Sequence, residues 1–271
     1  MTLSRAARVL LAAVMALGLA VIYLPLSIVL VNSFNADRTF AWPPPGWTLS
    51  WWARAWRNEG ARAALATSVK AGLGATAIAL VLGTMVAFAV GRYRFFGRGS
   101  LSLLVLLPIA LPGIVTGIAL DTAFRSVVEP LGIGKGLFSV IVGHATFCVV
   151  VVYNNVLARL RRLGGNLEEA AADLGADTFQ TFRDVTFPLL RSALFAGGLL
   201  AFALSFDEIV VTTFTAGPGI QTLPIWIFSN LFRPNQAPVI NVVASVLIVL
   251  SVVPVWLAQR AGGSGHAGGR L

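Results

Sequence analysis

Long apolar runs without charge dominate this sequence and restrict what it can fold into. Residues 9–31 contain no charged side chain and follow Arg5 and Arg8. About 20 consecutive apolar residues are enough to cross a bilayer as a helix. The run is also too long for the apolar core of a signal peptide, so we expect an uncleaved membrane helix with its N-terminus inside.

The overall composition supports a membrane protein. Only 11% of the residues are charged and 57% are hydrophobic, whereas soluble domains carry about 25% charged residues. A net charge of +9 would suggest nucleic-acid binding in a soluble protein. Here the arginines are dispersed between apolar runs, which indicates a positive-inside bias and contact with anionic lipid instead.

The remaining apolar runs predict an all-α polytopic membrane protein with six transmembrane helices. The later helices are expected at 65–90, 101–120, 136–157, 192–216 and 239–257. We divide the chain into an N-terminal helix with a Trp-rich extracytoplasmic loop (1–62), a membrane domain (63–258) with a cytoplasmic loop at 158–191, and a disordered cytoplasmic tail (259–271). With six spans, more of the Lys and Arg residues lie on the side of the membrane that holds the N-terminus than on the other side. Since positive charge favours the cytoplasmic side, both termini are predicted to be cytoplasmic.

Two local patterns refine this outline. Trp52 and Trp56 are four residues apart, which predicts a short helix over 49–56 on the outer membrane surface. Pro108 and Pro112 fall inside the third expected span, where neighbouring helices can satisfy the freed carbonyls. Gly113 and Gly117 have the spacing that permits close helix contact.

The cytoplasmic segment 168–188 has the pattern of a helix, a turn and a second helix. Leu167, Ala170, Ala171 and Leu174 recur on one helical face, and Glu168 and Glu169 lie near its N-terminus, where negative charge suits the helix dipole. Gly175 is expected to end this helix in a left-handed conformation, and Thr178 to cap the next. Pro188 is expected to interrupt the chain before the fifth span.

This segment resembles the signature loop of binding-protein-dependent ABC importer permeases. In that family the pattern is Glu-Ala-Ala, three residues, Gly, nine residues, and Ile-x-Leu-Pro. Here it is present as Glu169-Ala170-Ala171, Gly175 and Val185-Thr186-Phe187-Pro188, with Val for Ile and Phe for Leu. The resemblance covers roughly residues 63–258 and implies a type I importer permease fold. It also implies that Glu169, Ala170, Ala171, Gly175 and Pro188 belong to a coupling helix that docks on an ATPase subunit.

The sequence lacks its own nucleotide site. A P-loop requires GxxxxGK[ST], and Gly134-Lys135, the one Gly-Lys pair, is followed by Gly136. We therefore expect a non-catalytic subunit that binds no cofactor, with ATP and Mg²⁺ held by partner ATPase chains. The resemblance implies a second homologous permease, two ATP-binding subunits and an extracytoplasmic substrate-binding protein as partners, in a bacterial inner membrane.

An acidic pair lies inside the fifth expected span. Asp207 is about 22 Å of helical rise beyond Ser192, which places it in the outer half of the membrane. On one continuous helix Glu208 would share a polar stripe with Ser205, Thr212 and Thr215. We assign Asp207, Glu208, Ser205 and Thr212 to a substrate pathway, with Glu208 as the better candidate to face it. The alternative is a pair that snorkels at the outer end of the helix.

The residues 205–219 and Thr222-Leu223-Pro224 resemble the spermidine/putrescine branch of the family, as does Ser33-Phe34-Asn35. The resemblance implies a polyamine substrate. Acidic residues would suit ferric iron or thiamine equally well, and an aminophosphonate permease is a further alternative. A membrane sensor or scaffold would not need the coupling loop, and a membrane-embedded enzyme would need more clustered His, Asp or Glu than this chain offers.

The two remaining reactive side chains have simpler interpretations. His144 is far in sequence from His266, so the pair does not suggest a metal site, and no metal is predicted. We expect His144 to be buried and hydrogen-bonded. Cys148 lies in an apolar run and is expected to be a small buried side chain.

Overall fold

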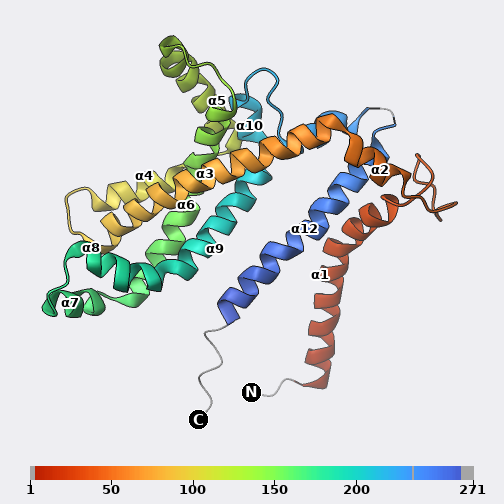
Figure 1. Ribbon diagram of the computed structural model, residues 1–271. Coiled ribbons are helices and arrows are strands. Elements are labelled where there is room, and N and C mark those ends of the chain that lie inside the picture. Colours follow the sequence, from red (N-terminus) through yellow and green to blue (C-terminus); the bar gives the residue numbers. More distant parts are fainter. Residues whose placement is uncertain (1–3, 234, 264–271) are drawn as a thin grey trace. The chain divides into compact units, whose positions relative to one another are not determined.

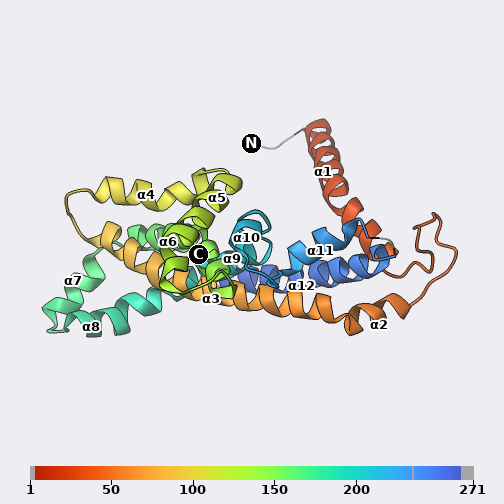
Figure 2. The same cartoon turned by 90° about the horizontal axis from the view of Figure 1, so that it is seen from above.

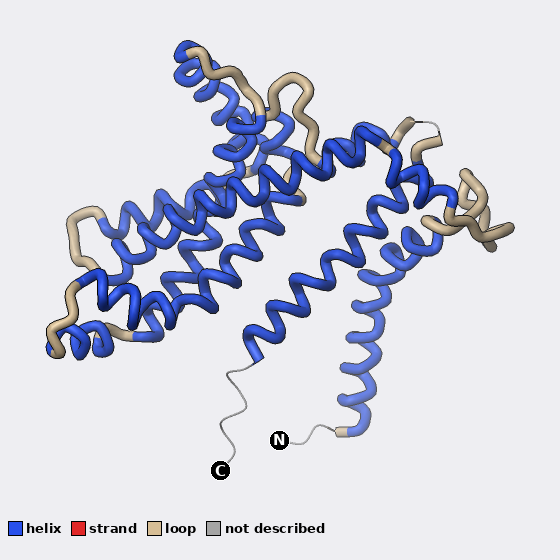
Figure 3. Tube along the Cα trace, in the orientation of Figure 1, coloured by secondary structure: helices blue, strands red, loops and turns tan. Residues whose placement is uncertain are grey.

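A computed structural model describes residues 4–233 and 235–263 of the chain. In this part of the chain the regular structure is helical, and one isolated bridge pairs Asn35 with Trp47 (Figure 3). The all-α fold class predicted from the sequence is confirmed. In chain order the elements are α1 (Arg5–Asn32), α2 (Ser50–Arg57), α3 (Glu59–Arg92), α4 (Arg98–Ala110), α5 (Gly113–Ala123), η1 (Phe124–Val128), η2 (Glu129–Leu131), α6 (Leu137–Leu163), α7 (Asn166–Asp173), α8 (Thr178–Thr181), η3 (Phe182–Thr186), α9 (Phe187–Phe206), α10 (Val210–Thr215), α11 (Leu223–Leu231) and α12 (Ala237–Gly263).

Each of the six predicted membrane segments corresponds to a helix or a broken pair of helices. Four helices among the described residues are long and apolar enough to cross a membrane: Arg5–Asn32, Glu59–Arg92, Leu137–Leu163 and Thr178–Phe206. The third predicted segment is a pair, Arg98–Ala110 and Gly113–Leu131. The sixth lies in α12, where the apolar helix found among the described residues is Ala237–Ser251.

The chain forms two compact units. The first contains residues 1–62 and 227–256, and the second residues 63–226 and 257–271. In the first unit, no residue of the apolar part of α1 is buried. The Ser245 hydroxyl of α12 donates to the Val29 carbonyl of α1 over 3.5 Å, and the two helices diverge from there (Figure 2).

The Trp-rich loop has its own small core. Trp51 of α2 is 4% exposed, and its indole N–H donates to the Asn35 carbonyl over 2.9 Å. The guanidinium groups of Arg38 and Arg54 lie 5.7 and 4.8 Å from the centre of the Trp51 ring, within the range of cation–π attraction. The short helix expected here is present, and Trp51 forms the centre of the loop's core.

The second unit is centred on α6, which packs against both α3 and α9, and these two helices also contact each other (Figure 1). Small residues allow this close packing. A Cβ added to Gly83 of α3 would lie 2.9 Å from the Val149 carbonyl oxygen of α6, so the two backbones are in near contact. α4 lies along α6, where the hydroxyls of Ser102 and Tyr153 are 2.7 Å apart (Figure 2).

The third predicted span, 101–120, is not one straight helix. The chain breaks at Leu111 and Pro112, and the two parts of the span meet at 106°. Pro112 lacks a backbone N–H, and the residue before a proline is driven to an extended conformation, which Leu111 adopts. The predicted close contact of Gly113 and Gly117 is present, because both face α10 at Val210 and Phe214.

The fifth predicted span, 192–216, is also broken. α9 ends at Phe206 and α10 begins at Val210, so Asp207 and Glu208 lie in a turn and not within a helix. The prediction of one continuous helix was wrong because its apolar pattern continues through the break. In α12 the helix runs to Gly263, beyond the predicted end at residue 257, and the rest of the predicted disordered tail lies outside the described residues.

Candidate functional site

α7, α8 and η3 lie at one end of the α3–α6–α9 bundle, opposite to α5 and α10 (Figure 1). Gly175 has a φ of +85°. Its N–H donates to the Ala172 carbonyl over 2.9 Å, and the N–H of Ala176 donates to the Ala171 carbonyl over 3.0 Å. This is a Schellman motif, in which a left-handed glycine ends a helix. The predicted role of Gly175 in the backbone is confirmed.

The cap of the second short helix differs from the prediction by one residue. Asp177, and not Thr178, is the N-cap of α8. Its carboxylate accepts from the Gln180 N–H over 2.8 Å, and the Gln180 side chain accepts from the Asp177 N–H over 2.9 Å. A carboxylate is as good an N-cap as a hydroxyl, and the glutamine three residues later completes a capping box.

Pro188 does not interrupt the chain, contrary to the prediction. α8, η3 and α9 form one apolar helical segment from Thr178 to Phe206. η3 is a π-helical turn directly before α9, and Pro188 occupies the first turn of α9. A wide π turn leaves no α-type hydrogen bond for the proline ring to break, so the helix continues past it.

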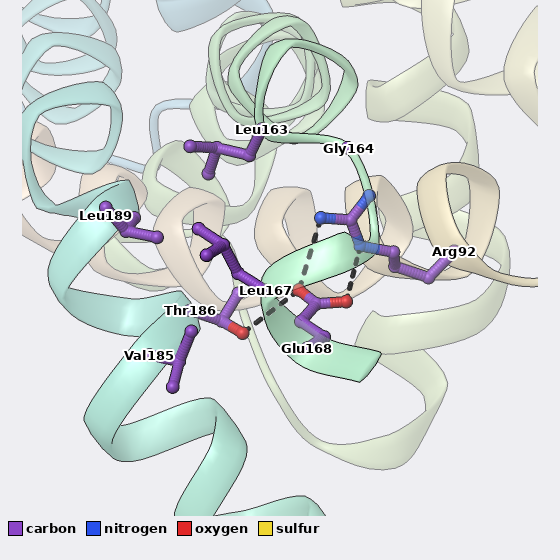
Figure 4. Close-up of a pocket in the computed structure, with 8 residues that line it drawn as sticks. All are labelled: Arg92, Leu163, Gly164, Leu167, Glu168, Val185, Thr186 and Leu189. Carbon is purple, nitrogen blue, oxygen red and sulfur yellow. Dashed lines mark hydrogen bonds and ion pairs between the residues drawn. The ribbon is translucent and has the colours of Figure 1, made fainter. Parts of the chain in front are cut away.

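Glu168 is the residue of α7 that connects the loop to the helical bundle. Arg92, at the end of α3, places its Nε 2.8 Å from Glu168 Oε2, and its Nη2 donates to Glu168 Oε1 over 3.2 Å (Figure 4). The Thr186 hydroxyl donates to the same Oε1 over 3.0 Å. Leu163, Leu167 and Leu189 close this small pocket on its apolar side (Figure 4).

The sequence motif did not single out Glu168, Arg92 or Thr186 as a group, because they come from segments up to 94 positions apart (186 − 92). Of the predicted coupling residues, Glu169, Ala170 and Gly175 are exposed, while Ala171 is half-buried. The loop therefore has two faces, one bonded to the bundle and one open with small side chains.

The second set of predicted residues surrounds the break between α9 and α10. His144 of α6 is fully buried, its Nδ1 lies 2.7 Å from the Ser205 hydroxyl, and its Nε2 lies 2.8 Å from the Thr212 hydroxyl. Ser205 precedes the break and Thr212 follows it. One imidazole therefore bridges the two ends of the interrupted helix, and the prediction that His144 is buried and hydrogen-bonded is confirmed.

The acids themselves are placed differently from one another. Asp207 is exposed. Glu208 is half-buried, and its Oε1 accepts from the Val211 N–H in the first turn of α10 over 2.8 Å. The predicted polar stripe is absent, because Ser205, Thr212 and Thr215 are buried in contacts with α6 or their own helix. Asp207 and Glu208 share the break but not one helical face.

The second unit thus combines broken apolar helices, closely packed at small residues, with a short exposed helix between two of them. A model of the family described as "Binding-protein-dependent transport system inner membrane component" matches residues 79–261. The chain belongs to this family, which consists of non-catalytic subunits of inner-membrane transport complexes.

Its relatives narrow the class further. The chain is 32% identical to the putrescine transport system permease protein PotI of Escherichia coli strain K12, over 92% of this chain and 90% of the relative. It is 35% identical to the spermidine/putrescine transport system permease protein PotC of the same strain, over 89% of each. Its fold matches a chain in the crystal structure of a bacterial ABC transporter involved in the import of the acidic polysaccharide alginate, with a TM-score of 0.70, 16% identity, and coverage of 98% of this chain and 100% of that one.

Proposed function

We propose that this chain is one permease subunit of an ABC importer for polyamines such as spermidine and putrescine. The observation that carries the proposal is similarity along almost the full length to permeases of that substrate class, at 32–35% identity. In the complete transporter the chain forms half of the translocation pathway. A second, homologous permease forms the other half, and an extracytoplasmic binding protein delivers the substrate.

ATP hydrolysis in this proposal takes place on two separate subunits that bind ATP and Mg²⁺. The open face of the α7 loop, with Glu169, Ala170, Ala171 and Gly175, docks on one of them, and Pro188 lies in the first turn of α9, which follows the loop. Small side chains support this role because they let a partner surface approach the helix backbone closely. The loop and both termini are then cytoplasmic.

The pathway for a cationic substrate passes the break between α9 and α10 in this proposal. Irregular backbone at membrane depth is tolerated where it lines a cavity or is buried in protein. Carboxylates there attract an ammonium group more strongly than in bulk water, because screening is weaker. Asp207 and Glu208 supply the charge, and Ser205 and Thr212 act on the pathway through the buried contact with His144 that holds the break.

A second substrate class has one specific observation in its favour. The chain is 30% identical, over 88% of its length, to a proposed 2-aminoethylphosphonate transport system permease of Salmonella choleraesuis. This ligand carries one ammonium group beside an anionic phosphonate. A purely acidic pathway would repel the phosphonate, so we place this substrate behind the polyamines.

Uptake into vesicles tests the proposal. The chain is reconstituted with its partner permease, ATPase subunits and binding protein, and labelled spermidine, putrescine, 2-aminoethylphosphonate, thiamine and ferric iron are offered separately. We expect ATP-dependent uptake of the two polyamines and competition between them. ATP-dependent uptake of one of the other three, without polyamine uptake, would replace the substrate and keep the class.

A further inference from the structure

The α7 loop is attached to the rest of the chain through glycines at both ends. Gly164 and Gly165 precede it, with a φ of +66° at Gly164, and Gly175 follows it with a φ of +85°. Glycine accepts these conformations at low cost and leaves the backbone free to change direction. The side-chain contacts of α7 with the bundle therefore decide how firmly the loop follows the helices around it.

Four elements, α3, α6, α7 and η3, meet around the ion pair of Arg92 and Glu168. Besides the ion pair with Glu168 of α7, which Figure 4 shows, Arg92 of α3 donates from Nη1 to the Leu160 carbonyl of α6 over 3.3 Å. Glu168 in turn accepts from Thr186, the last residue of η3 before α9. Both carboxylate oxygens of Glu168 thus have partners within the chain, unlike the exposed carboxylate of Glu169.

The contact between Arg92, Glu168 and Thr186 is largely withdrawn from solvent. The side chains of Arg92 and Glu168 are 18% and 25% exposed, and Thr186 is 3% exposed. Ion pairs on an open surface contribute little because water screens them and long side chains lose entropy. The Arg92–Glu168 pair is mostly withdrawn from water and has two further partners, the Thr186 hydroxyl and the Leu160 carbonyl. These hydrogen bonds fix both the separation and the orientation of the two charged side chains.

We propose that Arg92, Glu168 and Thr186 form a positioning junction that transmits movement of the α7 loop to α3 and α9. This proposal rests on the proposed function, because the movement comes from an ATPase subunit docked on the other face of the loop. Glu169 and its neighbours contact the ATPase, and Glu168 passes the displacement on. Without the junction, the glycines at the ends of α7 absorb the displacement, and the ATPase still binds.

The test uses the complete transporter, purified with its ATPase subunits and its binding protein. The variants are Glu168→Gln, which removes the charge, and Thr186→Val, which removes the hydroxyl and keeps the side-chain shape. Thr186→Ser keeps the hydroxyl and is the matched control, and Arg94→Gln controls for loss of a neighbouring exposed arginine. Co-purification of the ATPase subunits and stimulation of ATP hydrolysis by the loaded binding protein are measured for each.

We expect Glu168→Gln and Thr186→Val to retain the ATPase subunits but to lose stimulation by at least about fivefold, the lower end of typical coupling between sites. Thr186→Ser and Arg94→Gln should be stimulated like the unmodified chain. Normal stimulation in Glu168→Gln and Thr186→Val would overturn the proposal. So would equal defects in Thr186→Val and Thr186→Ser, or loss of the ATPase subunits in Glu168→Gln, since both indicate a purely structural brace.

The readout separates this proposal from the substrate assignment. Stimulation is measured with the binding protein carrying its own ligand, so it does not depend on that ligand being a polyamine. If the unmodified complex is stimulated but takes up no polyamine, the substrate assignment fails and the junction is still judged by its variants. If the unmodified chain does not co-purify with an ATPase, both proposals are wrong.

Discussion

Glu168 and Glu169 are consecutive residues of α7 with opposite surroundings. Glu168 lies 2.8 Å from the Arg92 guanidinium and turns toward the bundle, whereas Glu169 is exposed. Successive residues on a helix point about 100° apart, so adjacent acids face different partners. One loop helix can therefore be bonded to its own chain on one side and open to another chain on the other.

The glycine that ends α7 is the first point to test. In Gly175→Val a β-branched side chain must adopt a φ of +85°, at a cost of about 1–2 kcal/mol or more. We expect ATP hydrolysis to be uncoupled from uptake while the subunits still assemble. Gly175→Asn is the matched control, because Asn tolerates this conformation, and it should stay coupled. The measurement is polyamine uptake per ATP hydrolysed, and normal coupling in Gly175→Val would contradict the role of the loop.

The exposed acid of the loop gives a separate prediction. Glu169→Lys reverses the charge on the face that we propose docks on the ATPase, without touching the contacts of Glu168. Uptake should fall on the order of tenfold, as for a like-charge contact of about 1.4 kcal/mol. Uptake and subunit yield are measured in parallel. Wild-type uptake would place the docking surface elsewhere.

The acids at the break between α9 and α10 should serve the substrate. Glu208→Gln keeps the side-chain size and the acceptor for the Val211 N–H, but removes the charge. We expect spermidine uptake to fall on the order of tenfold, because a carboxylate and an ammonium interact by about 1–4 kcal/mol at contact. Glu129→Gln removes an exposed acid away from the break and is the control. Equal uptake by the two variants would leave Glu208 only as the acceptor of the Val211 N–H.

We expect His144 to stabilise the folded arrangement of α9 and α10 around the break, and not to contact the substrate. His144→Leu removes the buried partner of the Ser205 hydroxyl, while the Thr212 hydroxyl keeps its bond to the Glu208 carbonyl. The unsatisfied Ser205 hydroxyl costs about 1–3 kcal/mol. The melting temperature of the purified complex should fall. Adding Ser205→Ala should recover much of the loss, because removing both polar partners of this contact together is nearly neutral. An unchanged melting temperature in His144→Leu would show that the bridge contributes nothing.

Two glycines of α5 differ in the space around them and offer a matched pair. A Cβ at Gly117 would overlap the Phe214 ring, whereas one at Gly113 would lie 3.6 Å from Val210. Gly117→Ala should therefore lower the stability of the complex by about 1–3 kcal/mol, as overpacking does, while Gly113→Ala should be tolerated. Thermal denaturation of both variants checks this, and equal midpoints would contradict the close contact of α5 with α10.

The sequence alone determined the class of this protein and the position of its loop. Uninterrupted apolar runs predict membrane helices because the lipid interior has no partners for backbone groups outside helices or barrels. The signature from Glu169 to Pro188 predicted the loop, and Gly175 its left-handed end, because that conformation depends on one local residue. The membrane helices, the loop and its glycine cap depend on composition and short-range spacing, which can be read from the sequence.

The tertiary structure alone decided which polar residues meet. Apolar periodicity continues through Asp207 and Glu208, so the break became visible only where His144 of α6 bridges Ser205 and Thr212. The pairing of Arg92 with Glu168 likewise depends on how the end of α3 packs beside α7. A buried polar group must find a partner wherever the fold provides one, and that partner is set by the packing of distant helices rather than by neighbouring residues in the chain.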